Sequence, residues 1–270
     1  MADIAPFLQS IKLPVMPEVA HALIRTLNDE DADITSVRDV IAKDPALTVT
    51  LLRMANSALF GLSRSVDTLD NAVSVVGMSQ IRARALSICM TNVFVLPHGL
   101  NRLEFWRSSM LCAGYARWLA GNIGCDEQKA WLTGMMLRLG ELVIGQKHPD
   151  ILAAIEAQPC APGDRWTRER TMSGFDEGQV TAEVARRWDF PEELTQALQW
   201  CARPLHGPVF SKLGGIVHLA ALLADTPNVT PETLDALPVA LTLALHLDMP
   251  CLRSSLPDAE LLSDTSTLQA

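Results

Sequence analysis

Apolar residues along this chain recur with the spacing of amphipathic helices. Positions i, i+3, i+4 and i+7 are apolar in nearly every hydrophobic stretch, as in the run from Val19 through Leu23 and Ile24 to Leu27. The few runs rich in valine and isoleucine lack the strict alternation and the turn dipeptides of β-hairpins. The pattern therefore predicts an all-α fold.

Five short helices are predicted within residues 8–96. Asp, Thr and Ser side chains accept hydrogen bonds from the free N–H groups of a first helical turn, and proline is preset for that turn. Such residues mark the expected helix starts at Pro17, Asp33, Asp44 with Pro45, Thr68 and Ser79. We expect these helices to form an N-terminal bundle that ends before Pro97-His98-Gly99, where the helical periodicity breaks.

A second helical unit is predicted over residues 102–207. Its expected helices cover Phe105–Leu119, Ala130–Ile144, 180–188 and the segment after Pro191, while residues 159–178, rich in Gly, Arg, Thr and Ser, are expected to be mostly loop. Helices over 209–224 and 231–247 belong to a C-terminal part, residues 208–257, that is expected to complete this unit, and residues 258–270 to be a flexible tail. No low-complexity linker separates the two units, so we expect them to pack together.

Composition narrows the function classes. The 22 Lys and Arg residues are outnumbered by 31 Asp and Glu, and the net charge of −9 argues against nucleic-acid binding, despite Arg82, Arg84 and the group Arg165, Arg168 and Arg170. No leader pattern and no apolar run long enough for a membrane span occurs, so we expect a cytoplasmic protein without a membrane partner. The six cysteines form no C-x-x-C pair and are expected to act as small apolar residues. Of the six tryptophans, Trp166 is the one we expect outside the core.

Several motifs resemble the signature of the HDOD family in order and spacing. The matching stretches are Leu13–Ala20, Ile41–Thr48, Leu52–Gly61, Ala72–Met78, Phe105–Ser108, Gly134–Gly140, Trp188–Pro191 and Trp200–Pro204, which together cover about residues 8–207. The resemblance implies an HDOD domain in which a helical N-terminal bundle packs on a subdomain derived from HD-type metal-dependent phosphohydrolases. It also implies a bacterial regulatory output module that is not an enzyme.

The metal ligands of HD hydrolases are missing from the positions that the resemblance assigns to them. The first histidine position reads Ser108, the His-Asp pair reads Leu137 and Arg138, and the later positions read Glu177, Cys201, Ala202 and Ala221. Leucine and alanine offer no ligand atom, and a guanidinium repels a cation. Glu177 and Cys201 lack a third partner, and no H-x-x-x-H or H-E-x-x-H spacing occurs among the six histidines. We therefore expect no metal, no cofactor and no catalysis.

Two functions follow as hypotheses. The first is a signalling module that binds a protein partner, with Asn56, Leu59 and Phe60 at a helix end as candidate contact residues. A structural alternative is that Phe60 packs inward and Asn56 satisfies helix-end carbonyls.

The second hypothesis is a remnant that still binds a nucleotide, such as a cyclic dinucleotide, in the former HD cleft. Its candidate residues are Arg138, Glu177 and His206, and His218 also lies near this region in the chain. The alternative for Arg138 is a solvent-facing position or a pair with Glu141.

Overall fold

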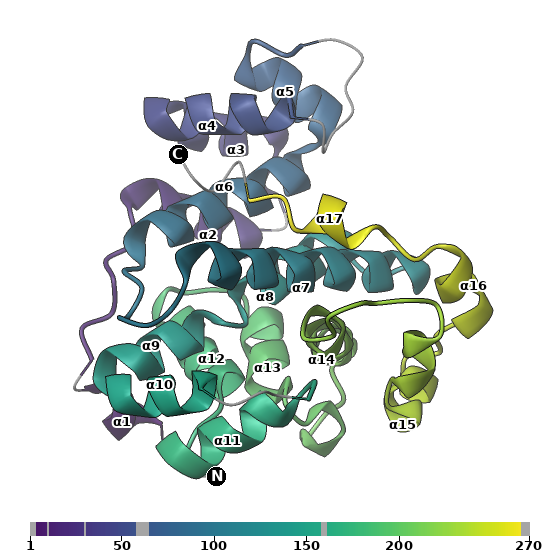
Figure 1. The fold of residues 1–270 in the computed structure, drawn as a ribbon. Helices are drawn as coiled ribbons and strands as arrows, with labels where there is room; N and C mark the ends of the chain where they lie inside the picture. Colours follow the sequence, from purple (N-terminus) through teal and green to yellow (C-terminus); the bar gives the residue numbers. More distant parts are fainter. Residues whose placement is uncertain (1–3, 10, 30, 58–64, 158–160, 266–270) are drawn as a thin grey trace.

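The computed structural model describes residues 4–9, 11–29, 31–57, 65–157 and 161–265, and these residues form helices joined by turns and loops, without a β-strand (Figure 1). The all-α prediction is confirmed. The α-helices are α1 (Ala5–Gln9), α2 (Glu18–Leu27), α3 (Ile34–Ala42), α4 (Pro45–Ala55), α5 (Leu69–Val76), α6 (Met78–Val93), α7 (Arg102–Asn122), α8 (Glu127–Met136), α9 (Leu139–Lys147), α10 (Pro149–Glu156), α11 (Asp164–Ser173), α12 (Glu177–Arg187), α13 (Glu192–Trp200), α14 (Lys212–Ala224), α15 (Val239–Ala244), α16 (Met249–Ser254) and α17 (Ala259–Leu262). Two 3-10 helices are η1 (Pro204–His206) and η2 (Thr233–Ala236).

Helices α2 to α6 form the N-terminal bundle, and three of the predicted caps are present. The side chains of Asp33, Asp44 and Thr68 each accept a hydrogen bond from the backbone N–H three residues further on, at 2.7, 3.0 and 3.2 Å. The predicted cap at Ser79 is wrong, because α6 begins one residue earlier, directly after Gly77. Gly77 has a φ of 95°, a conformation that other residues rarely adopt, so the turn between α5 and α6 depends on this glycine.

Helix α1 lies outside this bundle, against the second helical unit (Figure 1). The Lys147 ammonium, at the end of α9, donates to the Phe7 carbonyl oxygen at 2.8 Å. The ring centroids of Phe7 and Phe175 are 5.4 Å apart. The first helix of the chain is therefore held by elements that follow it by about 140 residues or more.

The two helical units pack together along α6 and α8. The Arg84 guanidinium of α6 lies 3.6 Å from the centre of the Trp131 ring of α8, a cation–π contact between two buried side chains. Burial lowers the pKa of Arg84 to about 9. At the end of α2, the Asn28 amide donates to the Asp189 carbonyl oxygen at 2.8 Å.

The helix expected over Ala130–Ile144 is divided in two by Leu137 and Arg138, between α8 and α9. The hydroxyl of Thr181 on α12 donates to the Leu137 carbonyl oxygen at 2.8 Å and accepts from the Gly140 N–H at 2.7 Å. Backbone groups that a continuous helix would pair internally are thus satisfied by one side chain from another helix. The break turns Arg138 into the interior, where it contributes to the site described below.

Residues 164–173 form helix α11, where the sequence predicted a loop. Gly163 and Gly174, with φ of 82° and 89°, bound this helix at its two ends. Its buried residues are Trp166 and Glu169, and the rest of the helix is strongly polar. The apolar stripe that marks a surface helix is therefore missing from α11, which explains the wrong prediction.

The C-terminal segment also differs from expectation. The helix expected over 231–247 is replaced by η2 and α15, which are separated at Pro238. The tail expected from Asp258 onward contains α17, which crosses α7 (Figure 1). A Cβ atom placed on Gly114 of α7 would lie 2.8 Å from the Leu262 side chain, so this glycine makes room for α17.

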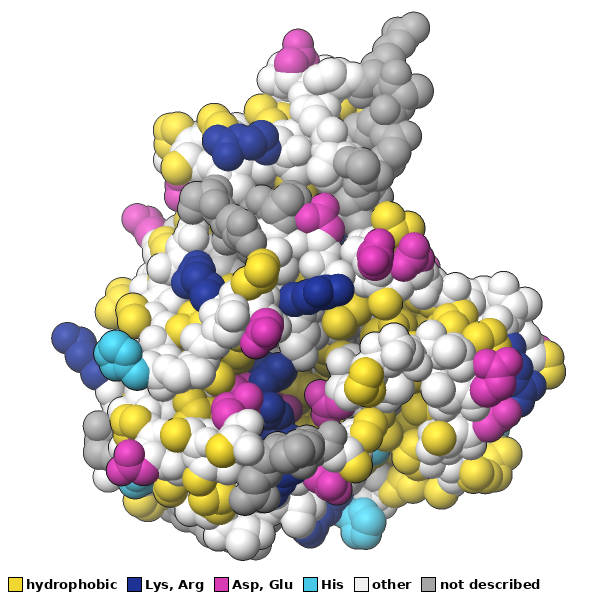
Figure 2. Space-filling model, viewed as in Figure 1, with side chains coloured by type: hydrophobic (Ala, Val, Ile, Leu, Met, Phe, Trp, Pro, Cys, Tyr) yellow, Lys and Arg dark blue, Asp and Glu magenta, His cyan; other side chains and the backbone are white. Residues whose placement is uncertain are grey.

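On the face shown in Figure 2, acidic and basic side chains are scattered among apolar and uncharged ones. None of the helices in the described ranges combines the length and the apolar character needed to cross a bilayer.

Candidate functional site

Residues from four helices and from the break between α8 and α9 line one small cavity, of about 10 Å³, in the second helical unit. Five of the seven positions that the resemblance assigned to HD metal ligands lie around it: Ser108 of α7, Leu137 and Arg138 at the α8–α9 break, Glu177 at the start of α12, and Ala221 of α14. The remaining lining residues are Cys112, Arg165, Ala224 and Asp225. Positions distant in sequence thus converge as they would in an HD-type site.

Two arginine side chains enter this region and share one buried glutamate. Arg138 contacts Oε2 of Glu141 through Nε at 2.9 Å and Nη2 at 2.6 Å, while Nη1 of Arg165 lies 3.5 Å from Oε1 of the same carboxylate. Arg165 also forms an ion pair with Glu156 at 2.5 Å. Glu141 is 1% exposed, and Arg138 and Arg165 are only 13% and 15% exposed. Burial alone would lower the pKa of each arginine. The attraction of the facing glutamates is stronger than this effect, so the pKa values of both Arg138 and Arg165 are raised.

Glu177 and Glu169 form the acidic side of the network. The indole N–H of Trp166 donates to Oε1 of Glu177 at 2.9 Å, and Oε2 of Glu169 accepts from the Glu177 backbone N–H at 2.7 Å. Oε2 of Glu177 and Oε1 of Glu169 have no hydrogen-bond partner within the described part of the chain. Burial raises the pKa of Glu177 to about 8, although Arg138 and Arg165 act in the opposite direction. Burial and the neighbouring Glu177 raise the pKa of Glu169 as well, so these carboxyl groups favour the protonated form near neutral pH.

These side chains do not fit a divalent metal. HD-type sites rely on imidazole and carboxylate ligands, whereas here two guanidiniums approach the same cavity and would repel a cation. Cys201 is fully buried, and burial raises the pKa of its thiol well above the usual value, which opposes the thiolate that a metal requires. Within the ranges that the structure describes, no three His, Cys, Asp or Glu side chains are grouped so as to hold a metal ion.

The structure brings two of the three candidate nucleotide-binding residues together and leaves the third apart. Arg138 and Glu177 lie together at the cavity, and the predicted alternative for Arg138, a pair with Glu141, is confirmed. His206 is exposed in η1 and is not among the residues that line the cavity. His218 lies closer to the network, with its ring centroid 4.9 Å from that of Trp166.

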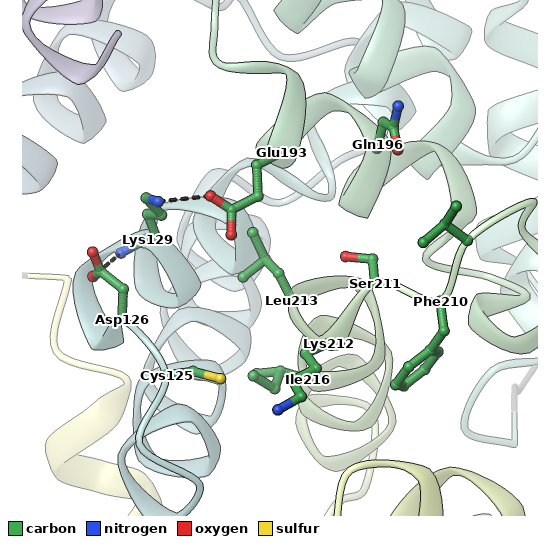
Figure 3. Close-up of a pocket in the computed structure, with 11 residues that line it drawn as sticks. Cys125, Asp126, Lys129, Glu193, Gln196, Phe210, Ser211, Lys212, Leu213 and Ile216 are labelled. Carbon is green, nitrogen blue, oxygen red and sulfur yellow. Dashed lines mark hydrogen bonds and ion pairs between the residues drawn. The ribbon is translucent and has the colours of Figure 1, made fainter. Parts of the chain in front are cut away.

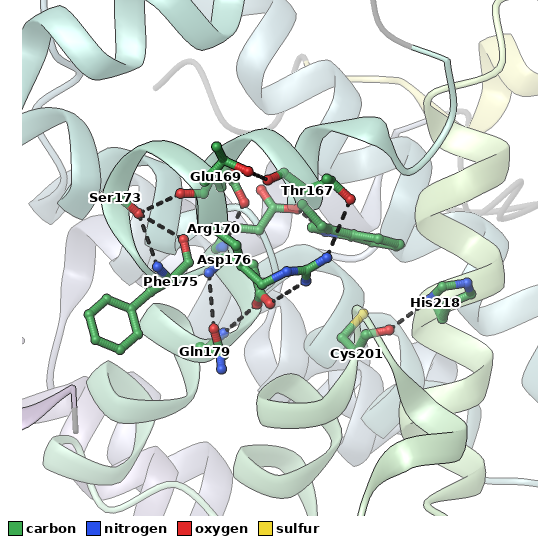
Figure 4. A network of polar contacts seen from close by, with 12 residues as sticks. Thr167, Glu169, Arg170, Ser173, Phe175, Asp176, Gln179, Cys201 and His218 are labelled. Atoms are coloured by element: carbon green, nitrogen blue, oxygen red, sulfur yellow. Dashed lines mark hydrogen bonds and ion pairs between the residues drawn. The ribbon is translucent and has the colours of Figure 1, made fainter. Parts of the chain in front are cut away.

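The arginines that suggested a nucleic-acid surface are engaged inside the molecule. Arg165 pairs with buried glutamates as described, Arg168 donates to the Ile155 carbonyl oxygen at 3.0 Å, and Arg170 pairs with Asp176 at 2.9 Å (Figure 4). The prediction that Trp166 lies outside the core is wrong, since it is 4% exposed. Its polar N–H is accommodated there because Glu177 accepts its hydrogen bond.

The link from α11 to α12 explains how Glu177 is held. Asp176 and Gln179 form a reciprocal capping box, in which each side chain bonds the backbone N–H of the other residue at 3.0 and 3.1 Å. The Ser173 hydroxyl donates to the Phe175 carbonyl oxygen at 2.8 Å (Figure 4). The D-x-x-Q spacing of residues 176–179 was a signal for this helix start that our sequence reasoning missed.

The candidate partner-binding turn is only partly described. The Asn56 amide donates to the carbonyl oxygens of Leu52 and Val66 at 2.9 and 2.7 Å, and its oxygen accepts from the Val66 N–H at 2.8 Å. These contacts correspond to the structural alternative for Asn56. Leu59 and Phe60 lie outside the described residues.

A separate pocket of about 360 Å³ lies between the starts of α8 and α14 (Figure 3). Its walls include the apolar side chains of Phe210, Leu213 and Ile216. The Lys129 ammonium and the Glu193 carboxylate, 2.6 Å apart, form an ion pair at this pocket. No residue of the predicted sites lines it.

Comparison with known proteins places this arrangement in a family. The model of the HDOD domain matches residues 13–204. A candidate phosphohydrolase from Shewanella amazonensis SB2B is similar in structure with a TM-score of 0.82 and 25% identity, over 98% of both chains. An HDOD domain protein of unknown function from Geobacter sulfurreducens has a TM-score of 0.77 at 20% identity, over 97% of this chain and 96% of its own.

Two relatives are longer than this chain. A candidate signal transduction protein from Marinobacter aquaeolei VT8 is similar in structure with a TM-score of 0.77 at 21% identity. The match covers 97% of this chain and 59% of that protein. An uncharacterized protein of Treponema pallidum (strain Nichols) is 24% identical over 201 residues, which are 73% of this chain and 39% of that protein. The chain thus spans about two fifths of the curated relative that it matches. With the family model covering well over half of its length, the chain belongs to the HDOD family.

Proposed function

We propose that this chain is a non-catalytic signal-transduction module that acts by binding a protein partner. One observation carries the proposal: Arg138, Arg165 and the buried Glu141 occupy the region where an HD hydrolase would hold its metals. The scaffold of the hydrolase is retained, while its central cavity is filled by an internal ion-pair network.

This ion-pair network does not offer the groups that metal-dependent hydrolysis requires. A metal-dependent hydrolase needs a bound cation to generate hydroxide near neutral pH and to stabilise charge on the phosphoryl oxygens. Here the positive charge comes from guanidiniums, which carry no exchangeable water, and each is already paired with a glutamate. The cavity of about 10 Å³ has room for about one water molecule and none for a phosphodiester.

Two comparisons favour a regulatory role. The Marinobacter aquaeolei neighbour is described as a signal transduction protein, and that chain and the Treponema pallidum relative are both longer than the matched region. A domain that recurs within longer chains is suited to pass a conformational change to its neighbours.

The alternative, a cyclic dinucleotide bound by Arg138 in the former cleft, has less support. Arg138 is engaged by Glu141, and the cavity beside it is far smaller than the roughly 300 Å³ at which small-molecule sites begin. His206, the third residue of that hypothesis, is exposed and away from the cavity.

Cross-linking capture in cells, followed by reconstitution with the purified partner, tests the proposal. We expect a saturable complex that persists in EDTA, needs no nucleotide and survives Arg138→Ala, with circular dichroism confirming that the variant is folded. Saturable binding of a cyclic dinucleotide that is lost in Arg138→Ala, without a protein complex, would overturn it in favour of the alternative.

A further inference from the structure

A cleft of about 510 Å³ lies next to the HD-type cavity, between α11 on one side and α14 with η2 on the other. One face of α11, with Gly163, Trp166, Thr167 and Arg170, forms the first wall. This volume is within the usual range of small-molecule sites. The cleft and the HD-type cavity have no lining residue in common, although Trp166 donates to Glu177 and the Gly163 N–H donates to Asp225 of the cavity.

The two ends of this cleft differ in charge. Arg170 and Arg203 both line the cleft, and Arg170 pairs with the Asp176 carboxylate at 2.9 Å. Burial raises the pKa of Asp176, and the charges of Arg170 and Arg203 act in the opposite direction. Two guanidiniums against one carboxylate leave a net positive charge there. Asp164, which lines the cleft itself, lies six residues before Arg170 on α11, about 9 Å away along the helix axis.

Two ring side chains form an uncharged part of the lining. The ring centroid of His218 lies 4.9 Å from that of Trp166, with the two planes tilted by 33°, and Nδ1 of His218 lies 2.7 Å from the Cys201 carbonyl oxygen (Figure 4). Because a carbonyl oxygen only accepts, Nδ1 carries the hydrogen in this contact. Burial lowers the pKa of His218, so the ring is neutral near pH 7. Leu222 and Leu237 continue the apolar lining toward the other end.

We propose that this cleft binds a small organic anion, with its phosphate or carboxylate between Arg170 and Arg203 and its flat apolar body along Trp166, Leu222 and Leu237. Charge-assisted hydrogen bonds to guanidinium are well suited to either anionic group. Thr167 and Thr226 also line the cleft; the Thr167 hydroxyl accepts from Arg170 at 3.4 Å, which leaves its hydrogen for a ligand, whereas the Thr226 hydroxyl donates to the Leu222 carbonyl oxygen at 2.8 Å. The inference is independent of the proposed function, since such binding neither requires nor excludes a protein partner.

Calorimetric titration with 1-naphthyl phosphate and 1-naphthoate tests the proposal, and NMR shifts of backbone amides locate the site. Inorganic phosphate and 1-naphthol, which carry only the anion or only the ring, are the comparison probes. We expect at least one ring-bearing anion to saturate with shifts at Thr167 and Thr226, and each comparison probe to bind at least about tenfold more weakly. The naphthyl compound that binds better identifies the preferred anionic group.

Arg203→Ala is the decisive variant, because Arg203 is exposed and its loss leaves the Arg170–Asp176 pair in place. We expect this substitution to weaken binding about tenfold, while the control Arg187→Ala, which removes an equal charge from the far end of α12, leaves it unchanged. Absence of saturation at low millimolar concentration, equal affinity in Arg203→Ala, or shifts confined to residues outside the cleft would each overturn the proposal.

Discussion

Replacing Glu177 by glutamine removes a proton-binding group from the buried network with little change of shape. Glutamine keeps the Oε1 atom that accepts the Trp166 hydrogen bond, and its amide occupies the place of the unpartnered Oε2. The substitution therefore isolates the cost of holding a charge at this position. A protonated Glu177 and a glutamine are both neutral, so the two proteins should have similar stability at low pH.

The direction of the pH dependence follows from the raised pKa. Between the unfolded value of 4.5 and the folded value of about 8, the folded protein holds a proton that the unfolded chain has released. The free energy of unfolding of the wild type therefore falls as pH rises through this window and levels off above it. At about 1.4 kcal/mol for each pH unit, the loss from Glu177 is at most about 5 kcal/mol. Glu177→Gln lacks this loss and should become the more stable protein by several kcal/mol near pH 8.5.

Urea denaturation of both proteins between pH 5 and pH 8.5 measures this difference. Glu193→Gln is the matched control, because Glu193 is 55% exposed in a surface pair with Lys129 and its removal should shift stability by less than about 1 kcal/mol at every pH. A pH-independent difference between Glu177→Gln and the wild type, or a variant that is less stable at pH 8.5, would rule out a raised pKa for Glu177. Either result would mean that Glu177 is ionised and stabilised by the arginines.

Three further substitutions test the fold around the site by urea denaturation at a single pH. Thr181→Val should lower the free energy of unfolding by about 1–3 kcal/mol, because two buried backbone groups at the α8–α9 break lose their partner; an unchanged value would contradict the account of that break. Gly140→Ala should cost about 3 kcal/mol or more, since its Cβ would lie 2.1 Å from the Glu177 carbonyl oxygen, and a neutral result would show that α9 and α12 separate easily. Asn56→Ala should cost about 1–3 kcal/mol through its lost hydrogen bonds to Val66 and the end of α4, whereas a stable variant with weakened partner binding would support the contact role instead.

Features that depend on neighbouring residues were predictable from the sequence. The caps at Asp33, Asp44 and Thr68 involve a backbone group only three residues away, so local chemistry determines them. The positions that converge on the cavity, including Leu137 and Glu177, followed from the resemblance to the HDOD family and not from periodicity.

Features that depend on distant residues were missed. The break between α8 and α9 is held by Thr181, 44 residues after Leu137, and the local sequence there is continuously helix-compatible. The buried residues of helix α11 are Trp166 and Glu169, and Trp166 donates a hydrogen bond to Glu177 on another helix. The buried face of α11 is therefore as polar in sequence as an exposed helix face. Arg165 is largely buried as well, and a buried charge is tolerated only where partners from other elements surround it, which the local sequence does not reveal.

We propose that the guanidiniums of Arg138 and Arg165 have taken the place of the metal ions of an HD-type site. This claim is tested by measuring metal content and manganese-dependent or iron-dependent hydrolysis of cyclic dinucleotides on one preparation purified without chelators. We predict far less than one metal ion per chain and no turnover above the protein-free control. Near-stoichiometric metal with turnover, lost in Glu177→Gln, would contradict the claim and make Glu177 a ligand.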